Sequence, residues 1–501
     1  MKKTLASTIK MGWAETDMTP YGRRIKLEGQ FYERISQSVE TPITATAWAV
    51  ESDGEQLVIC STDNTMVYRF WMDEVRKKVA EACPDLDVSK IICHATHTHN
   101  SFSPEPPDTM GATLDILATE LGLTASLEGE GSILRDGLMT AREATDFLVE
   151  KVTDAIVRAW QGRRPGYFAP AFGRAAVGMC RRVVYQDGHA AMWGDAYRDD
   201  FFSLEGGNDN GMELLFTYDE KMKMNGVIVN LSCPSQVMEQ RYEISSDYWG
   251  KVKILLRRKF GEDFKVLGLC SPAGDQCPRD LIRWIEPETP IEDPNIWRPN
   301  PPVHRADPSM FDVAGTWRIG RRIVGEILAI LEEEELEPQG EAVLKHETLK
   351  LPLPLRRVSE KEYKEAKKVI DRFLVENKGK EVDYQTAARM HVHAGTLARY
   401  EVQQKESIVP SEVHVVRFGD LAFATNPFEL FLDFANVIRA RSKAAQTFLV
   451  QLSCDALGYL PTEKAEKGGH YSAYISSGYV GHEGGYMLAE ETLKEIEKLF
   501  S

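Results

Sequence analysis

The chain has 501 residues, of which 43% are hydrophobic and 27% are charged, a composition typical of globular proteins. Its net charge of -16 and its isoelectric point near 5.3 argue against nucleic acid or an anionic membrane surface as a binding partner. At roughly 150 residues per domain the length allows two to four structural units, although α/β domains can be larger.

The N-terminal segment, residues 1–10, has two lysines but lacks the apolar stretch of a signal peptide. No apolar run reaches the about 20 residues that a membrane-spanning helix needs. We therefore expect a cytoplasmic protein without a membrane span. The 8 cysteines are scattered and form no CxxC pair, which indicates buried free thiols in a reducing compartment.

The first hundred residues predict a βαβ unit. Residues 44–50 and 56–61 have the composition of strands, and Asp53-Gly54 between them predicts a hairpin turn. Residues 72–82 show helical periodicity, and Ile91-Ile92 marks a further buried strand. A strand, a helix and a strand joined by short links require a sheet that is at least partly parallel.

The rest of the chain continues in the same mixed pattern, so we predict an α/β fold with a mixed sheet and flanking helices. Prolines at 352 and 354 restrict residues 351–355 to an edge strand. Residues 101–140 predict either a lid over a pocket or a surface insertion, and 285–308 predict a surface excursion. The other predicted strands are 179–185, 212–218, 226–231, 265–270, 413–425 as a hairpin and 447–452; the helices are 144–160, 248–260, 311–335, 361–377 and 487–500.

A histidine-rich motif, His94-Ala95-Thr96-His97-Thr98-His99, follows the buried strand at 91–92. The carboxyl end of a strand is where open α/β sheets usually bind ligands. Along an extended segment His97 and His99 would point to the same side. Such a pair suits two metal ligands, or one ligand and one acid or base. Surface histidines without a role are the alternative interpretation.

The stretch Ala95–His99, ATHTH, resembles the hallmark of the neutral/alkaline non-lysosomal ceramidase family. Further segments resemble landmarks of that family in the same order: Ala14–Pro20, Arg181-Arg182, Ala273–Pro278, Asn426–Glu429, Gly458–Thr462 and Tyr471. The resemblance covers essentially the whole chain. It implies one catalytic domain over 1–501, either undivided or with subdomains at about 1–340 and 341–501, and the family's C-terminal immunoglobulin-like domain is expected to be absent.

By this resemblance the site would bind zinc and hydrolyse an amide bond. Zinc accepts nitrogen and oxygen ligands and lowers the pKa of a bound water to about 7. Without the resemblance, Glu429 would be read as an acid at the N-terminus of the following helix and Tyr459 as an ordinary loop tyrosine. The residues assigned to metal binding are His97, Glu429, Tyr459 and Gln236, those assigned to catalysis are His99, Arg181 and Tyr471, and those assigned to substrate binding are His94, Asn100 and Asp275.

One family ligand is missing. The family has a second ligand histidine after a strand, and the matching segment here is Asn230–Pro234, in which Pro234 stands where that histidine is expected. Cys233, Gln236 or the second HxH motif, His391-Val392-His393, could replace it, although that motif is also typical of a strand with exposed histidines. A site of Glu, Tyr, Gln and one His would also accept manganese or magnesium.

These observations predict a metal-dependent hydrolase acting on an amide bond of a small-molecule substrate that need not be a lipid. A carbohydrate-active hydrolase on the same scaffold is the second interpretation. A binding homologue without catalytic activity is the third, and the missing histidine favours it. The sequence carries no signal for substrate identity, metal identity or oligomeric state.

Overall fold

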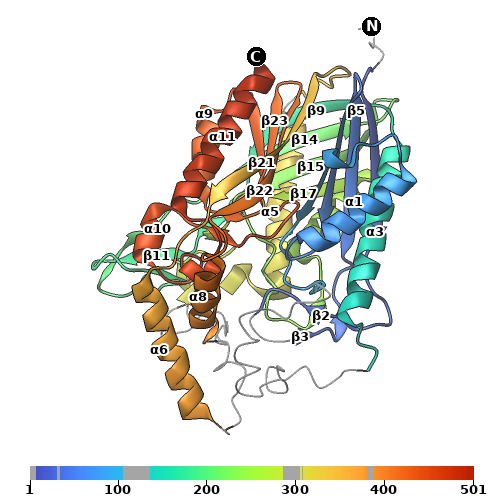
Figure 1. The fold of residues 1–501 in the computed structure, drawn as a ribbon. Coiled ribbons are helices and arrows are strands. Elements are labelled where there is room, and N and C mark those ends of the chain that lie inside the picture. The colour runs from blue at the N-terminus through green and yellow to red at the C-terminus, as the bar shows by residue number, and fades with distance from the viewer. Residues whose placement is uncertain are drawn as a thin grey trace.

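Three large sheets form the centre of the molecule, and helices cover their outer sides (Figure 1). This computed structural model describes residues 7–30, 34–104, 136–285, 305–306, 308–333, 335–378, 380 and 389–501. The sequence predicted long irregular segments at 101–140 and 285–308. Most of each, 105–135 and 286–304, lies outside the described residues. The predicted mixed α/β class is confirmed.

The first sheet has the strand order β7-β6-β5-β1-β8. Strands β6 and β7 are parallel and are connected by α1, so the predicted βαβ unit is confirmed. Asp53 and Gly54 have φ values of 51° and 82°, as a tight hairpin turn requires. Helix α3 (Ala141–Gln161) packs on β1 and β5. The bounds are β1 (Lys10–Asp17), β5 (Thr44–Ser52), β6 (Glu55–Thr62), α1 (Arg69–Ala82), β7 (Ile91–Ala95) and β8 (Arg164–Pro165).

The second sheet has the order β17-β15-β14-β9, and its strands contact both other sheets (Figure 1). The predicted antiparallel pairing of β14 with β15 is confirmed, and β15 runs parallel to β17. Helices α4 and α5 pack against each other and against this sheet. The bounds are β9 (Tyr167–Arg174), β14 (Gly211–Tyr218), β15 (Met224–Leu231), α4 (Asp247–Phe260), β17 (Lys265–Cys270) and α5 (Asp312–Glu333).

The third sheet has the order β21-β22-β23-β25 and is covered by α9 and α11 (Figure 1). Strand β21 carries Pro352 and Pro354 and lies at the edge, as expected for a strand that lacks two backbone donors. The bounds are β21 (Leu344–Pro354), β22 (Ile408–Phe418), β23 (Leu421–Thr425), α9 (Leu432–Arg441), β25 (Gln446–Val450) and α11 (His482–Phe500).

The second HxH motif lies on a helix, so the expected strand at 391–393 is wrong. Helix α8 (His391–Val402) begins at the first of these histidines. The residues that follow include Ala394, Leu397 and Ala398, which favour helix over strand. The other elements are β2 (Lys26–Leu27), β3 (Arg34–Ile35), β4 (Ser38–Val39), η1 (Val88–Lys90), β10 (Met179–Cys180), β11 (Arg182–Tyr185), β12 (Ala190–Met192), β13 (Phe201–Leu204), β16 (Glu243–Ile244), β18 (Gln276–Cys277), β19 (Trp284–Ile285), β20 (Arg305–Ala306), η3 (Pro308–Met310), α6 (Glu360–Asn377), β24 (Glu429–Leu430), β26 (Tyr459–Leu460), α10 (Glu463–Gly468) and η4 (Ile475–Ser477).

Aromatic side chains join the first and third sheets into one hydrophobic core. Trp48 of β5 packs with its ring centroid 5.7 Å from Phe418 and 6.5 Å from Phe423. Phe168 of β9 reaches Phe418 at 4.3 Å, which adds the second sheet. The carboxyl ends of strands from all three sheets therefore keep fixed positions relative to one another. A division of the chain near residue 340 stays a prediction.

In the part of the chain that the structure describes, every helix is too short or too polar to cross a membrane.

Candidate active site

The site begins at His97, two residues beyond the end of β7. Its backbone has a φ of 67°, so the histidine motif is not extended as expected, and it turns sharply at this residue. The His97 N–H donates to Asn64 O at 2.9 Å, and Nδ1 lies 2.8 Å from Thr65 O. Because a carbonyl only accepts, Nδ1 carries a proton, and in the neutral imidazole the lone pair is on Nε2.

Two further buried groups face this lone pair. His97 Nε2 is 3.4 Å from Glu429 Oε2 and 3.4 Å from His99 Nε2. The exposed fractions of His97, His99 and Glu429 are 3%, 7% and 4%. The expectation that the two histidines point to the same side is confirmed. The cause is the turn at His97 and not an extended backbone.

Backbone pairing brings Glu429 and Tyr459 together. Each lies in a strand of two residues, and β24 and β26 pair in parallel with Glu429 opposite Tyr459. Helix α9 begins three residues later at Leu432, so the interpretation of Glu429 as a first-turn acid of that helix is wrong. Burial and the Glu429 carboxylate raise the pKa of Tyr459 well above its usual value, so its hydroxyl stays protonated.

Arg181 separates β10 from β11, which divides the single strand expected at 179–185. It donates to Tyr459 Oη at 3.2 Å and to Gly274 O at 2.9 Å. Burial would lower the pKa of this guanidinium, but Tyr459 and Glu429 beside it raise the value above the usual one, so Arg181 remains charged. The site therefore contains one fixed positive charge next to the tyrosine.

Tyr471 completes the aromatic side of the site. Its ring meets that of Tyr459 edge to face, with centroids 5.5 Å apart. Its loop is fixed by the buried Arg182, which donates to Tyr471 O at 2.8 Å and to Gly469 O at 2.7 Å. Glu205 holds the same guanidinium at 2.7 Å. Four of the residues that the sequence analysis assigned to the metal or to catalysis are thus brought into contact with His97 or Tyr459: His99, Arg181, Glu429 and Tyr471.

The three residues assigned to substrate binding make contacts with the backbone. Both ring nitrogens of His94 are occupied, since Nδ1 lies 2.8 Å from Gln451 O and Nε2 accepts from Cys270 N at 2.9 Å. Asn100 donates to Glu243 O at 2.9 Å, and Asp275 Oδ1 accepts from Leu432 N at 2.9 Å. Burial raises the pKa of Asp275 to about 6. These bonds hold the loops of the site in place, and substrate contact stays a prediction.

The segment around the missing histidine runs beside the histidine motif. Ser235 N donates to Thr96 O at 3.3 Å, and Gln236 is buried. Cys233 Sγ lies 3.4 Å from Val177 O, and burial raises the pKa of this thiol well above its usual value. The position of the segment leaves Gln236 as a candidate ligand, whereas the Cys233 thiol is engaged with a backbone carbonyl.

A buried ion pair that the sequence did not indicate lies on the far side of His99. Glu239 Oε2 is 3.7 Å from His99 Nδ1, and Glu239 Oε1 is 2.9 Å from Arg279 Nη2. The Arg279 guanidinium lies over the rings of Trp193 and Phe311, at 4.4 and 4.2 Å from their centroids. No local pattern marks an acid whose partners, Arg279 and His99, lie 40 and 140 residues away along the chain.

A second cluster also offers metal-binding atoms. Among the described residues, only Glu412, His414 and Cys454 present three His, Cys, Asp or Glu donor atoms within 4.8 Å of one another. Arg76 donates to Glu412 at 2.5 Å and lies 3.8 Å from Cys454 Sγ, and Arg69 binds the same carboxylate at 2.6 Å. A guanidinium thus already occupies the place of a cation.

We expect Cys454→Ser to leave the metal content of the protein unchanged, because Arg76 neutralises this cluster without a metal. Elemental analysis of the variant and the wild type after the same zinc loading measures this. A loss of about one zinc per chain from Cys454→Ser would contradict the expectation.

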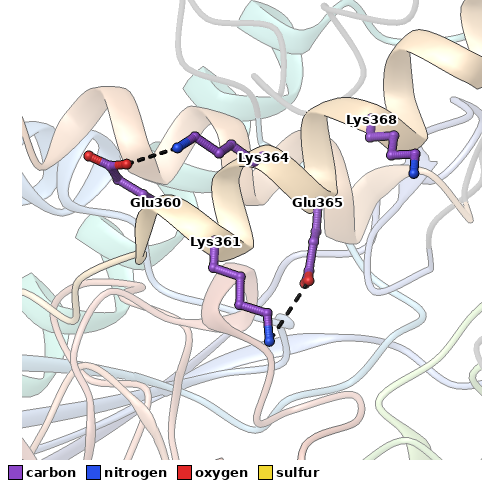
Figure 2. Close-up of a pocket in the computed structure, with 5 residues that line it drawn as sticks. All are labelled: Glu360, Lys361, Lys364, Glu365 and Lys368. Atoms are coloured by element: carbon purple, nitrogen blue, oxygen red, sulfur yellow. Dashed lines mark hydrogen bonds and ion pairs between the residues drawn. The ribbon is translucent and has the colours of Figure 1, made fainter.

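A surface hollow on α6 differs from these buried clusters because charged residues on the helix surface line it. It is lined by Glu360, Lys361, Lys364, Glu365 and Lys368 (Figure 2). Two of its ion pairs join successive helical turns, Glu360 with Lys364 at 3.0 Å and Lys361 with Glu365 at 4.0 Å. Exposed pairs at this spacing contribute only about 0.3–0.5 kcal/mol each and are typical of a solvated helix face.

Solved structures with the same arrangement of elements exist. The neutral ceramidase from Pseudomonas aeruginosa matches with a TM-score of 0.64 and 15% identity over 97% of this chain and 74% of that chain. The fold is that of a neutral ceramidase. A ceramidase complexed with C2 matches with a TM-score of 0.65 and 14% identity over the same shares. No protein-family model matches the chain, and no curated protein matches it.

The ceramidase fold confirms what the ordered sequence motifs implied about the architecture. At 14–15% identity the likeness concerns the fold, and the chemistry rests on the residues of this chain. The absence of an immunoglobulin-like domain stays a prediction.

The site around His97 has the donor set of a divalent cation site. His97 Nε2 and the Glu429 carboxylate are both acceptors, and they face each other in a buried place. Two acceptors at this distance repel each other unless a cation or a proton lies between them. The neutral hydroxyl of Tyr459 borders the same place. Nitrogen and oxygen donors of this kind fit zinc or manganese.

Proposed function

We propose that this protein is a metal-dependent hydrolase that cleaves an amide bond of a small molecule by attack of water. One observation carries the proposal: the His97 Nε2 lone pair and the Glu429 carboxylate converge, both buried, at 3.4 Å. The ceramidase fold supports the proposal, because the solved structures that share it are named for a hydrolase activity. The substrate class follows that name and extends to amides other than ceramide.

His97, Glu429 and Tyr459, with Gln236 as a further donor, are the residues that would hold the ion. A divalent ion there supplies a bound water with a pKa near neutrality. By the resemblance to the family, His99 would remove the proton of this water. Burial lowers the pKa of His99 well below its usual value, so this imidazole is neutral at pH 7.

The opposite side of the site suits the developing negative charge. Attack on an amide carbonyl places charge on its oxygen, and buried donors stabilise that charge more than water does. Arg181 stays charged, and the hydroxyl of Tyr471 stays protonated because burial raises its pKa. Removal of one such donor typically lowers kcat by about 10²–10³.

We expect the purified, zinc-loaded protein to release free amine from at least one member of a panel of N-acyl compounds that includes short-chain ceramide. His97→Ala should lower kcat/KM by at least about 10³, because the ion and its water are lost together. Released amine is measured by derivatisation and chromatography. The matched control is His189→Ala, which removes an exposed histidine.

Equal inactivity of the wild type and His97→Ala across the panel would contradict the proposal and favour a binding homologue. Release of sugar from glycosides in a parallel panel, without release of amine, would replace the amide substrate by a carbohydrate.

A further inference from the structure

His99 has the surroundings of a metal ligand. A ligand histidine binds through one ring nitrogen and donates the other N–H to a carboxylate, a carbonyl or water, which fixes the ring. His97 shows this pattern, with Nδ1 bonded to Thr65 O. His99 has part of this arrangement: a carboxylate oxygen, Glu239 Oε2, lies 3.7 Å from its Nδ1, although Nδ1 makes no hydrogen bond at this distance.

The protons around the two imidazoles can be counted. His97 holds its proton on Nδ1, so its Nε2 is an acceptor. If His99 carries its proton on Nδ1, facing the Glu239 carboxylate, its Nε2 is also an acceptor. Two lone pairs then face each other at 3.4 Å in a buried place. If His99 instead carries its proton on Nε2, the bare Nδ1 faces a carboxylate. Either arrangement places two acceptors next to each other.

The distance between the two nitrogens suits a bound ion. Two donors about 2.1 Å from a tetrahedral ion lie about 3.4 Å apart. The Nε2 atoms of His97 and His99 are 3.4 Å apart, and His97 Nε2 and Glu429 Oε2 are separated by the same distance. These three donors are not all within 4.8 Å of one another, so closing them on one ion requires the Glu429 or His99 side chain to rotate.

We propose that His99 is itself a metal ligand in this chain, that it supplies through Nε2 the donor lost at Pro234, and that Glu239 orients it. The inference rests on the proposed function, since it assumes that an ion binds at His97. A histidine that binds an ion through Nε2 cannot accept a proton there, so the ligand role replaces the proton-transfer role given by the resemblance.

Neighbouring side chains hold Glu239 in a fixed position. The carboxylate is 3% exposed, and Arg279 holds its other oxygen at 2.9 Å. Trp193 and Phe311 flank the guanidinium, which keeps the ion pair in one geometry. A buried carboxylate with one oxygen anchored and the other next to a ring nitrogen is the outer-shell partner that a ligand histidine requires.

The experiment measures metal binding and does not need a substrate. Wild type, His99→Ala, Glu239→Gln and the control His189→Ala are titrated with Zn²⁺ in competition with a chromophoric chelator, and their Co²⁺ forms are compared by visible absorption. We expect His99→Ala to lose tight binding and Glu239→Gln to bind zinc about 10–100-fold more weakly. The Co²⁺ spectrum of Glu239→Gln should shift, while His189→Ala should match the wild type.

Failure of the inference differs from failure of the proposed function. If the wild type binds zinc and His99→Ala binds it equally well, His99 is not a ligand, and the hydrolase proposal stands. If the wild type binds none of zinc, cobalt or manganese, both are overturned. Circular dichroism of each variant checks folding, and an unfolded His99→Ala is replaced by His99→Gln, for which the same loss of tight binding is expected.

Discussion

Replacing His94 with alanine is expected to lower the free energy of unfolding by about 3–5 kcal/mol. His94 lies where the three sheets meet, in β7, and its ring nitrogens bond to Gln451 O and Cys270 N. Those two groups follow β25 of the third sheet and end β17 of the second. The variant leaves the buried Cys270 N–H without its His94 partner, leaves Gln451 O with only the Ser453 hydroxyl at 3.2 Å, and leaves a cavity where the ring was.

Urea unfolding at pH 7 measures this loss. The matched control is His393→Ala, a half-buried histidine on α8, for which a change below about 1 kcal/mol is expected. If His94→Ala also changed the free energy of unfolding by less than about 1 kcal/mol, the sheets would be held together without this residue.

The contribution of His94 also depends on pH, and its sign follows from the direction of the shift. Burial lowers the pKa of His94 to about 3, whereas the unfolded chain has the ordinary value near 6.5. At pH values between these two pKa values the unfolded state binds a proton that the folded state does not bind. The stability of the folded protein therefore falls as pH falls below 6.5. The loss is about 1.4 kcal/mol per pH unit. The difference in stability between wild type and His94→Ala should therefore shrink between pH 6.5 and pH 5.

Glu429→Gln is expected to remove the metal and the hydrolase activity together. The substitution keeps the shape of the side chain but removes the negative charge beside His97 Nε2. A neutral amide binds a divalent cation far less strongly than a carboxylate, and the buried Arg181 nearby then repels the ion without compensation. We expect zinc affinity to fall at least about 100-fold and amine release to fall at least about 10³-fold.

Elemental analysis after dialysis at a defined zinc concentration gives the metal content of the Glu429→Gln protein. The matched control is Glu213→Gln, a buried carboxylate that pairs with Arg439 at 3.1 Å. Retention of about one zinc per chain by Glu429→Gln would place the ion elsewhere in the protein. Since β24 and β26 pair through the backbone, the variant should keep the fold, and its melting temperature checks this.

Local patterns in the sequence predicted most of the elements correctly. Asp53-Gly54 between two strand-like runs predicted the hairpin of the first sheet, because both residues tolerate a positive φ. The prolines of β21 predicted an edge strand. The motif His391-Val392-His393 was misjudged because the spacing of two histidines says nothing about the helix-forming residues that follow.

The candidate site was predictable only in part. The histidine motif could be located because it directly follows a buried strand, and the family resemblance pointed to Arg181, Glu429, Tyr459 and Tyr471. The resemblance gave no partner for His99, and no local sequence pattern identifies Glu239 as a buried acid. Its role depends on Arg279 and on the loop of His99, which only the packed chain brings next to it.

The sequence by itself determined most of the longer strands and helices and where the histidines follow a strand, because side-chain periodicity and turn residues act over a few positions. Only the tertiary structure decided that Glu429 meets Tyr459 and that His94 joins three sheets. Strands of two residues have no periodicity to detect. A buried polar group finds its partner through the packing of the whole core, in which every sheet has to be in place first.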